Sequence, residues 1–392
     1  MQLTDFFQFH APTKIVYGPG LARDLEAELN DLKARRIFVI TDNHVQQMDF
    51  YQETIDGINR TGAQVVGVFS DVPANSGLKT VKQGATLGSE LEADSILAIG
   101  GGSVIDTAKG VNAEMSLAGD LMTDFCGTHT MPHPLNPLIV IPTTAGTGSE
   151  VTLVAVIMNE EEKTKMAFVD RYLVPNLAVL DPEVTLSMPP YLTASTGMDA
   201  MAHAVEAYLG VDASPYSDAL ALQAMVMIRD NIVKACQDGQ NIEARGNMLV
   251  ASNLAGVAFS HSMVGVGHGM AHSCGGLCGV PHGVANHILL PYAMRYNLNA
   301  CEDRLGVLAR LFFIKGTGLT GRELAEKAID AVFELQRELA RGAGMPVRLS
   351  QVGVKEKDLP EIATATLSDG TCIYNPREVV YEEVLQSLKE AF

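Results

Sequence analysis

The sequence predicts two domains, an α/β domain over residues 1–187 and an all-helical domain over residues 188–392. In the first half, short apolar runs rich in valine and isoleucine alternate with stretches of helical pattern. This alternation is typical of a parallel sheet that helices cover on both faces. In the second half, strand signals nearly vanish and Ala, Leu, Met and Glu recur at helical spacing. The pair Pro189-Pro190 marks the boundary, because proline ends regular structure.

The elements of the first half are expected to follow one another as strand and helix. The candidate strands are residues 14–20, 35–42, 63–70, 94–102, 137–144, 151–158 and 176–182. Helices are predicted between strands at 76–92 and 103–116, and in the second half at 216–236 and 321–344. We expect the strands to form a parallel sheet with helices on both faces.

Composition and charge narrow the possible partners. The 392 residues are 47% hydrophobic and 19% charged, as in a globular protein with two real cores. The net charge of −18 argues against nucleic acid or an anionic membrane as a partner, because both are polyanions. The six scattered cysteines do not resemble a disulfide framework, and the first 14 residues show no secretory signal. A cytoplasmic protein with no membrane partner is therefore expected.

One long segment carries no formal charge. Residues 246–294 contain no Asp, Glu, Lys or Arg, so length alone would permit a membrane-spanning helix. The same segment holds five of the ten histidines, together with many Gly and Ser residues. Imidazoles are avoided in a bilayer and gathered at a buried metal site, which favours a metal site here.

A glycine-rich loop follows the strand predicted at 94–102. Gly100, Gly101, Gly102 and Ser103 stand between this strand and a helix. Glycines let the backbone come close to a ligand, and the helix N-terminus offers N–H groups to a phosphate. By itself the loop fits an ordinary strand–loop–helix turn equally well, because the G-x-G-x-x-G spacing is missing.

A second polar loop strengthens the nucleotide interpretation. Residues 141–152 also follow an apolar strand, and hydroxyls that could bond phosphate or ribose come from Thr143, Thr144, Thr147 and Ser149. Two such loops after two strands predict a dinucleotide site. Asp42 ends another strand, where it could bind an adenosine ribose and favour NAD over NADP, or simply cap a helix.

Several histidines and one aspartate form a candidate metal site. Asp199 and His203 are four residues apart and share one face of a predicted helix. His268, His272 and His282 lie in the charge-free segment. One carboxylate and several imidazoles suit Fe²⁺ or Zn²⁺. A closed zinc site is a rival that the spacing leaves open, with ligands His268, His272, Cys274 and Cys278.

Taken together, these motifs resemble the iron-containing (group III) alcohol dehydrogenase family along nearly the whole chain. The similar segments, in order, are YGPG, GGGSVIDTAK, IPTTAGTGSE, NLAVLDPEVT, GMDAMAHAVEAY, HGMAHSCGG, PHGVAN and NPRE. Within the family, the resemblance is to lactaldehyde (1,2-propanediol) reductases and bacillar methanol dehydrogenases. It implies the dehydroquinate synthase-like fold, with an N-terminal dinucleotide-binding domain and a helical metal-binding domain.

The resemblance also assigns roles to individual residues. It implies that the metal ligands are Asp199, His203, His268 and His282, and that His272 is a non-ligand catalytic residue near the reacting atoms. Cofactor contacts are implied for Asp42, Gly101, Gly102, Ser103, Thr143, Thr144, Ser149 and Lys165. The alternative for Lys165 is an ordinary solvated charge, and the same applies to Lys109 of the GGGSxxDxAK motif. His261 stands where relatives often have Asn, and we expect it to be a structural hydrogen bonder.

The implied activity is hydride transfer between a small alcohol and its aldehyde or ketone. NAD is expected as the cofactor in preference to NADP, and Fe²⁺ as the metal with Zn²⁺ as the alternative. A homodimer or larger homo-oligomer is also implied. Two other functions stay open: a glycerol dehydrogenase-like enzyme of the same fold, and a metal hydrolase or metal-binding module that uses no dinucleotide. The two polar loops argue against the last.

Overall fold

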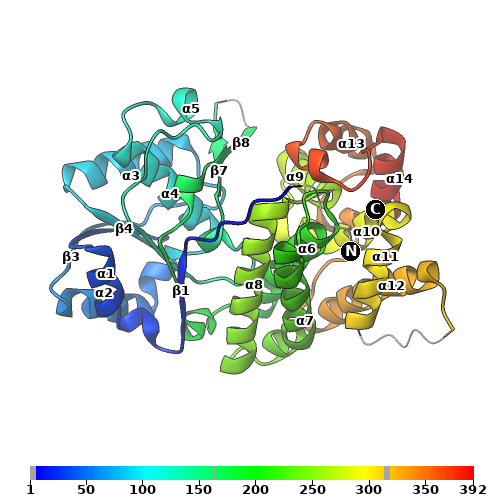
Figure 1. Ribbon diagram of the computed structural model, residues 1–392, viewed down its shortest axis with the longest axis horizontal. Coiled ribbons are helices and arrows are strands. Elements are labelled where there is room, and N and C mark those ends of the chain that lie inside the picture. Colours follow the sequence, from blue (N-terminus) through cyan, green and yellow to red (C-terminus); the bar gives the residue numbers. More distant parts are fainter. Residues whose placement is uncertain (1–5, 162–163, 313–317) are drawn as a thin grey trace. The chain divides into compact units, whose positions relative to one another are not determined.

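The structure of the protein is a computed structural model that describes residues 6–161, 164–312 and 318–392 (Figure 1). Two compact units are present, residues 10–187 and residues 188–392, and the second also includes residues 6–9. The sequence predicts residues 6–9 in the α/β domain, and this prediction is wrong. The ring of Phe9 stacks on Tyr216 at 5.1 Å and on His261 at 4.2 Å, and both partners belong to the helical unit.

A six-stranded parallel sheet forms the centre of the first unit, as the sequence predicts. Its strands are β1 (Lys14–Tyr17), β2 (Arg36–Ile40), β3 (Gln64–Phe69), β4 (Ser95–Gly100), β6 (Leu138–Pro142) and β9 (Leu177–Leu180). Their order across the sheet is β1-β9-β6-β4-β2-β3. The central strands are apolar runs buried along their whole length, which is why they lie in the middle of a sheet covered on both faces.

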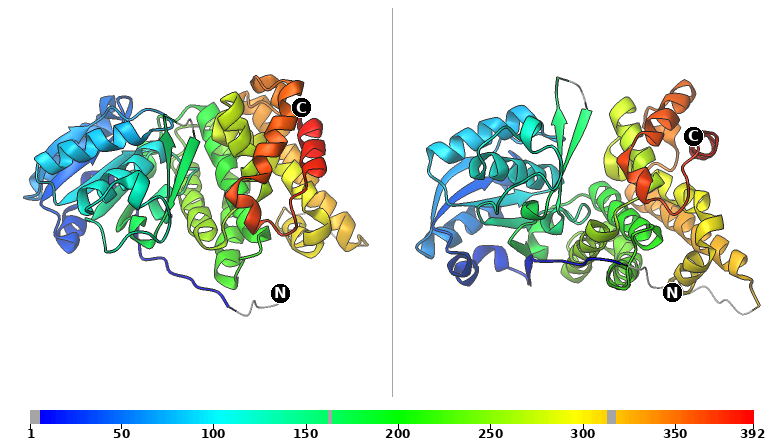
Figure 2. Two further views of the ribbon diagram at one scale, coloured as in Figure 1. Left: turned by 90° about the horizontal axis from the view of Figure 1, so that it is seen from above. Right: turned by 45° about the horizontal axis from the view of Figure 1, so that its top comes forward.

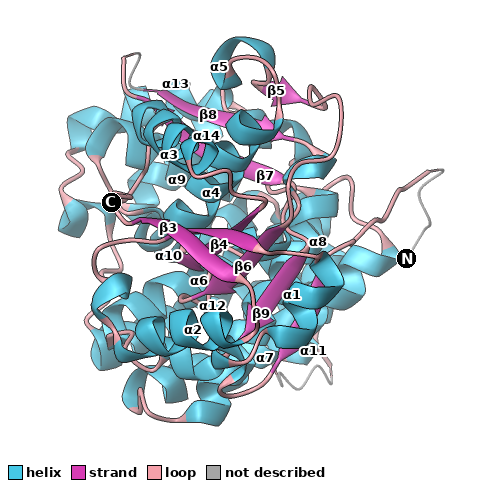
Figure 3. Ribbon diagram, turned by 90° about the vertical axis from the view of Figure 1, so that its left-hand side faces the viewer, coloured by secondary structure: helices cyan, strands magenta, loops and turns pink. Residues whose placement is uncertain are grey.

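Helices cover both faces of this sheet (Figure 3). They are α1 (Glu26–Leu32), α2 (Asp49–Arg60), α3 (Leu78–Glu90) and α4 (Gly102–Ser116). Alternate residues of each strand point to opposite faces. Phe38 and Ile96 join one core with side chains of α3 and α4, whereas Ile37 and Leu97 join a second core with those of α1 and α2. The expected pattern of helices on both faces is confirmed.

One predicted strand does not join the parallel sheet. The apolar run predicted at 151–158 forms β7 (Val154–Asn159), which pairs antiparallel with β8 (Thr164–Val169) in a separate sheet (Figure 2). The short strand β5 (Gly127–Thr128) completes this sheet. The sequence did not indicate β8, because Thr164 and Lys165 are exposed and weaken its apolar pattern. A short helix, α5 (Leu121–Asp124), precedes β5.

Every regular element from Pro190 onward is helical within the described residues. These helices are α6 (Pro190–Leu209), α7 (Pro215–Gln237), α8 (Ile242–Ser262), α9 (Val266–Cys278), α10 (His282–Tyr296), α11 (Leu298–Leu311), α12 (Gly321–Ala343), α13 (Leu359–Leu367) and α14 (Tyr381–Ala391). Local signals set several ends. Pro190 starts α6 with the backbone angle that the first turn needs, and Thr320 and Glu323 form a capping box at α12.

The charge-free segment folds mainly as buried helix. Helices α6, α7 and α8 lie side by side (Figure 1), and most of the segment lies in α8, in α9 and in α10 up to Met294. No single described helix is both long and apolar enough to cross a membrane, and the α8–α9 pair that meets the length and composition criteria is bent by 103°. All six cysteines are free thiols.

Candidate metal centre and nucleotide loops

The glycine loop links a central strand to a buried helix in the α/β unit. Strand β4 ends at Gly100, and α4 begins at Gly102 with Gly101 as its N-cap and no side-chain capping bond. A Cβ atom on Gly102 would lie 2.7 Å from the Thr147 Cγ2 atom, and one on Gly101 would lie 3.2 Å from the Thr144 hydroxyl. The two polar loops predicted from the sequence therefore pack against each other, and glycine is required for this close approach.

The residues whose hydroxyls are predicted to bind the cofactor differ in the hydrogen bonds that they make within the protein. The Ser103 hydroxyl accepts from the Asn75 backbone N–H at 3.2 Å. The Ser149 hydroxyl bonds the carboxylate of Asp106. Thr143 is buried, and its backbone N–H donates to the Gly100 carbonyl at 3.1 Å. The loops are thus held rigidly by bonds of their own, which suits them to present backbone N–H groups to a bound anion.

Lys109 is not a solvated helix charge, so that alternative is wrong. Its ammonium is fully buried and donates to the Thr152 carbonyl at 2.7 Å, the Thr152 hydroxyl at 3.0 Å and the Val154 carbonyl at 2.8 Å. Burial lowers its pKa to about 8, although Asp106 and Glu150 oppose the shift. Lys109 therefore ties α4 to the segment that leads into β7, and its role is structural.

Asp42 and Lys165, both predicted to contact the cofactor, have different surroundings. The Asp42 carboxylate accepts from the backbone N–H groups of His44 at 2.9 Å and Val45 at 2.8 Å. This is the capping role that the sequence offered as one of two alternatives. Lys165 is exposed on β8, and its charge helps to lower the pKa of Asp106, which burial raises overall.

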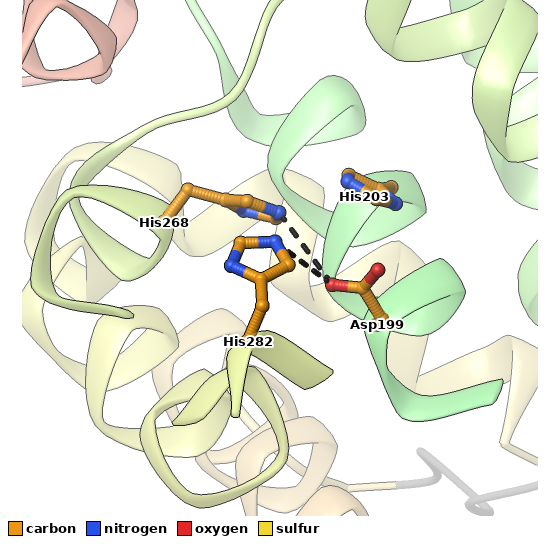
Figure 4. A group of neighbouring side chains, drawn as sticks. All are labelled: Asp199, His203, His268 and His282. Carbon is orange, nitrogen blue, oxygen red and sulfur yellow. Dashed lines mark ion pairs between the residues drawn. The ribbon is translucent and has the colours of Figure 1, made fainter. Parts of the chain in front are cut away.

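Four side chains of the helical unit converge on one point (Figure 4). Asp199 and His203 come from α6, His268 from the first turn of α9 and His282 from the first residue of α10. One ligand atom from each lies within 4.8 Å of the other three, and all but His282 are buried. The next residue, Gly283, allows α10 to approach α6 closely, because a Cβ atom there would lie 2.6 Å from the Ser195 carbonyl oxygen.

The donor atoms fit a single divalent cation. The Asp199 Oδ1 atom lies 3.3 Å from His282 Nε2 and 3.9 Å from His268 Nε2. Four ligands at about 2.1 Å from a tetrahedral ion lie about 3.4 Å from one another, so these separations are close to what an ion needs. Three imidazoles and one carboxylate are a donor set that Fe²⁺ and Zn²⁺ both accept.

A neighbouring amide shows that these acceptors point the same way. The Asn286 Nδ2 atom donates to Asp199 Oδ1 at 2.6 Å and lies 3.1 Å from the Nε2 atoms of both His268 and His282. Three acceptor atoms from three helices thus face one hydrogen-bearing nitrogen. Such a cluster of acceptors around an electropositive group is what a cation site requires.

Buried charges shape the electrostatics of the cluster. Burial alone would raise the pKa of Asp199, but the three imidazoles lower it to about 2. Burial is also the main reason why the pKa of His282 lies well below its ordinary value, and Asp199 opposes this shift. Asp199 is therefore a carboxylate and His282 a neutral imidazole near neutral pH, which are the forms that bind a metal.

His272 lies beside the cluster and pairs with a carboxylate. Its Nδ1 atom is 2.9 Å from Asp369 Oδ2, and its ring stacks on His282 with 5.3 Å between centroids. Burial would raise the pKa of Asp369, but His272 and Thr371 lower it to about 2. The His272 side chain is 33% exposed, so it reaches both the cluster and solvent.

The rival zinc ligand set is not assembled. Among the described residues, the convergent group that contains His268 includes neither cysteine of α9. Cys274 is fully buried, and burial raises the pKa of its thiol to about 12, which disfavours the thiolate that zinc would need. Cys278 lies 4.0 Å from an Asp358 carboxylate oxygen, which also raises its pKa after burial.

Sequence reasoning missed three polar residues around the cluster, Glu206, Asn286 and Asp369. Glu206 follows His203 by three residues and Asn286 follows His282 by four, so helical spacing could have found both. Asp369 is 97 residues from His272, and no local pattern signals the pair. His261 bonds the Val257 carbonyl at 2.7 Å and stacks on Phe9, as its structural interpretation expects.

Loops suited to a dinucleotide in one unit and a mostly buried cluster of potential metal ligands in the other are typical of metal-dependent dehydrogenases that use a nicotinamide cofactor. Comparison with known proteins agrees. Residues 12–182 match the family model of iron-containing alcohol dehydrogenase, and residues 193–392 match that of the C-terminal part of the Fe-containing alcohol dehydrogenase family.

Individual relatives cover almost the whole chain. 1,3-Propanediol dehydrogenase of Klebsiella pneumoniae is 37% identical over 98% of this chain and 99% of its own length. NAD-dependent methanol dehydrogenase of Bacillus methanolicus is 33% identical over 99% of this chain and 100% of its own. A solved alcohol dehydrogenase from Oenococcus oeni superposes with a TM-score of 0.94 at 36% identity, over 99% of this chain and 100% of its own.

The chain belongs to the iron-containing alcohol dehydrogenase family. It is an enzyme, an alcohol dehydrogenase that uses a nicotinamide cofactor and a metal ion and interconverts a small alcohol with its carbonyl product. The resemblance and the fold class predicted from the sequence are confirmed. The alternative of a metal hydrolase or binding module without a dinucleotide is thereby excluded.

Proposed function

We propose that Asp199, His203, His268 and His282 hold one divalent ion, with Fe²⁺ as the native metal and Zn²⁺ as the alternative. The observation that carries this proposal is the convergence of their four ligand atoms within 4.8 Å. When bound, the ion supplies a Lewis acid that lowers the pKa of an alcohol oxygen. The net charge of the ligand set, one carboxylate and three neutral imidazoles, leaves about one positive charge on a divalent site to do this.

His272 is proposed as the residue that moves the alcohol proton. Its partial exposure gives the ring a route to solvent, and the Asp369 carboxylate at 2.9 Å orients it. A proton taken up on its free ring nitrogen can therefore pass to bulk water without crossing the buried cluster. The hydroxyl group of the substrate would lose its proton by this route, and the nicotinamide cofactor would supply the acceptor for the hydride of the carbinol carbon.

The nicotinamide cofactor is proposed to be NAD rather than NADP. Its pyrophosphate would lie on the glycine loop, with further contacts from the neighbouring polar residues; the proposed set is Asp42, Gly101, Gly102, Ser103, Thr143, Thr144, Ser149 and Lys165. Asp42 accounts for the preference, because its carboxylate would repel a 2′-phosphate. In Asp42→Asn the cap is retained and the charge is removed, so the NADPH-to-NADH ratio of dissociation constants should fall.

The substrate is proposed to be a short-chain alcohol or its aldehyde. Relatives at 37% and 33% identity act, by name, on 1,3-propanediol and on methanol, so their substrates alone span one to three carbons. A panel of C1–C4 alcohols, diols and aldehydes with NAD(H) and NADP(H) would identify the best pair. Cytoplasmic location and assembly as a homodimer or larger homo-oligomer stay predictions from the sequence.

Metal titration of chelator-treated protein tests the central proposal. The wild type should bind one equivalent of Fe²⁺ under anaerobic conditions, or of Zn²⁺, and activity should return with occupancy. In His282→Ala and His203→Ala, metal binding and activity should be lost together, while NADH binding measured by fluorescence persists, because the glycine loop belongs to the other unit.

His261→Gln is the matched control. It removes an imidazole from the same helical unit, on α8, but one whose Nδ1 atom bonds a backbone carbonyl and lies outside the convergent group. This variant should bind metal as the wild type does. Full activity in the metal-free enzyme, or tight metal binding by His282→Ala, would contradict the ligand assignment.

A further inference from the structure

Glu206 is a buried carboxylate for which the ligand set proposed above has no role. It lies on α6, three residues after His203 and seven after Asp199, so all three share one face of that helix. The residue is 5% exposed, and His268, which it contacts, is 2% exposed. A buried carboxylate is costly unless its oxygens are fully hydrogen bonded.

Both oxygens of Glu206 are used at the start of α9. Its Oε1 atom accepts from the Gly267 backbone N–H at 2.7 Å, and its Oε2 atom accepts from the His268 backbone N–H at 3.1 Å. These are N–H groups of the first helical turn, which have no partner within their own helix. The N-cap of α9 is Gly265, which has no side chain to cap them. Glu206 therefore caps α9 from another helix.

The same carboxylate also bonds the imidazole ring of His268. Its Oε2 atom lies 2.5 Å from His268 Nδ1, on the side of the ring opposite the convergent point. Since a carboxylate only accepts hydrogen bonds, Nδ1 must carry a proton, and in the neutral ring Nε2 is then bare. Nε2 is the atom that faces Asp199 and Asn286, at 3.9 Å and 3.1 Å.

The chain leaves space for this arrangement. A Cβ atom on Gly267 would lie 2.7 Å from Glu206 Oε1 and 3.1 Å from its Cδ atom, so any larger residue there would push the carboxylate away. A glycine directly before the histidine thus lets one carboxylate reach the helix end and the ring together.

We propose that Glu206 is the positioning residue of the metal centre: it holds His268 in the tautomer and orientation that present Nε2 to the ion. This inference rests on the ligand set of the proposed function and adds a residue that contacts one of its ligands. A carboxylate behind a ligand histidine fixes its tautomer and makes the ring a stronger donor, and loss of such a partner typically lowers metal affinity by about 10–100-fold.

Glu206→Gln tests the proposal with almost no change in shape. The glutamine amide has one oxygen and one NH₂ group. The NH₂ group must therefore face either the Gly267 N–H or the two N–H donors of His268, and the contact between two donors is repulsive. We expect the dissociation constant for Zn²⁺, measured on chelator-treated protein by competition with a coloured chelator, to rise about 10–100-fold. The Co²⁺ absorption spectrum should change as well, because the position of one ligand changes.

Asn375→Ala is the matched control for the capping role. Its Oδ1 atom accepts from the Val266 N–H at 3.2 Å, in the same first turn of α9, but no bond from Asn375 to the His268 ring is present in the described residues. This variant weakens the cap and also removes the bonds between Asn375 and Asn297, but it does not free the ring, so its affinity for Zn²⁺ should stay within about threefold of the wild type. Equal losses in Asn375→Ala and Glu206→Gln would reduce Glu206 to a helix cap and overturn the proposal.

A measurement on the wild type needs no variant to fold. In ¹⁵N-histidine-labelled, Zn²⁺-loaded protein, the His268 ring should show a protonated Nδ1 and a metal-shifted Nε2, and this His268 signal should change in Glu206→Gln. An Nδ1 without a proton would overturn the proposal even if Glu206→Gln is unstable. Suppose that the wild type binds Zn²⁺, that His282→Ala does not, and that folded Glu206→Gln binds it as the wild type does. This result would refute the role of Glu206 alone. If the wild type itself bound no Zn²⁺, both the ligand set and the role of Glu206 would be refuted.

Discussion

Acid should destabilise the helical unit through one histidine that is not among the proposed ligands. His287 lies on α10 and is completely buried. Burial lowers its pKa from 6.5 to about 4, and the nearby Pro346 backbone opposes part of this shift. Between pH 6.5 and pH 4, His287 is therefore protonated in the unfolded chain but not in the folded chain, so folding becomes less favourable as the pH falls.

The size of the effect follows from the two pKa values. Each unit of difference corresponds to about 1.4 kcal/mol, so the full contribution is roughly 3 kcal/mol once the pH is below 4. Between pH 7 and pH 5, about 2 kcal/mol of the free energy of unfolding should be lost through His287 alone. Above pH 7 the imidazole is neutral in both states and contributes almost nothing to the pH dependence.

His287→Leu removes the titrating ring and keeps a side chain of similar volume. Urea unfolding measures the free energy of unfolding of wild type and variant at pH 7 and pH 5, with metal removed from both. The pH-dependent loss in one protein is then subtracted from that in the other, and the contributions of the other histidines cancel. We expect the variant to lose about 2 kcal/mol less than the wild type between the two pH values. An equal loss in both proteins would show that His287 accepts a proton in the folded state, contrary to the burial argument.

Three further predictions concern other parts of the chain. Gly102→Ala places a methyl group 2.7 Å from Thr147 Cγ2, so NADH affinity measured by fluorescence should fall at least about tenfold, and unchanged affinity would remove the loop from the nucleotide site. Arg245→Met deletes the buried guanidinium that bonds two backbone carbonyls and a hydroxyl. Urea unfolding should show that the free energy of unfolding falls by about 2–4 kcal/mol, and a fall below about 0.5 kcal/mol would contradict this prediction. Asp369→Asn leaves His272 without its charged partner, so steady-state kcat should fall about tenfold with Zn²⁺ and NADH affinities unchanged, and wild-type kcat would argue against the pair as the proton path.

The fold could be predicted largely because its strands and helices carry strong local patterns. The buried runs that became β4 and β6 are apolar apart from Ser95, and α12 has both an amphipathic face and a capping box. The run at 151–158 was placed in the wrong sheet, since an apolar sequence says nothing about which strand it will pair with. The partner β8 has an exposed lysine and an irregular pattern that hides it.

The convergent group agrees with the ligand set that the family resemblance implied, whereas residue spacing alone left open the rival set that contains Cys274 and Cys278. The residues that contact the ligands were harder to predict, since Glu206 and Asn286 differ from ordinary polar helix positions only in what they contact. Lys109 shows the reverse error, because a lysine within a helix is usually solvated, and only the packing of β7 against α4 reveals its burial.

The amide of Asn286 links three helices at the candidate metal centre. It donates to Asp199 on α6, lies 3.1 Å from the His268 Nε2 atom on α9, and itself belongs to α10. Three of the four proposed ligands therefore contact this one side chain. Although Asn286 is not a proposed ligand, a change at this position is expected to shift the ligand atoms of three helices together.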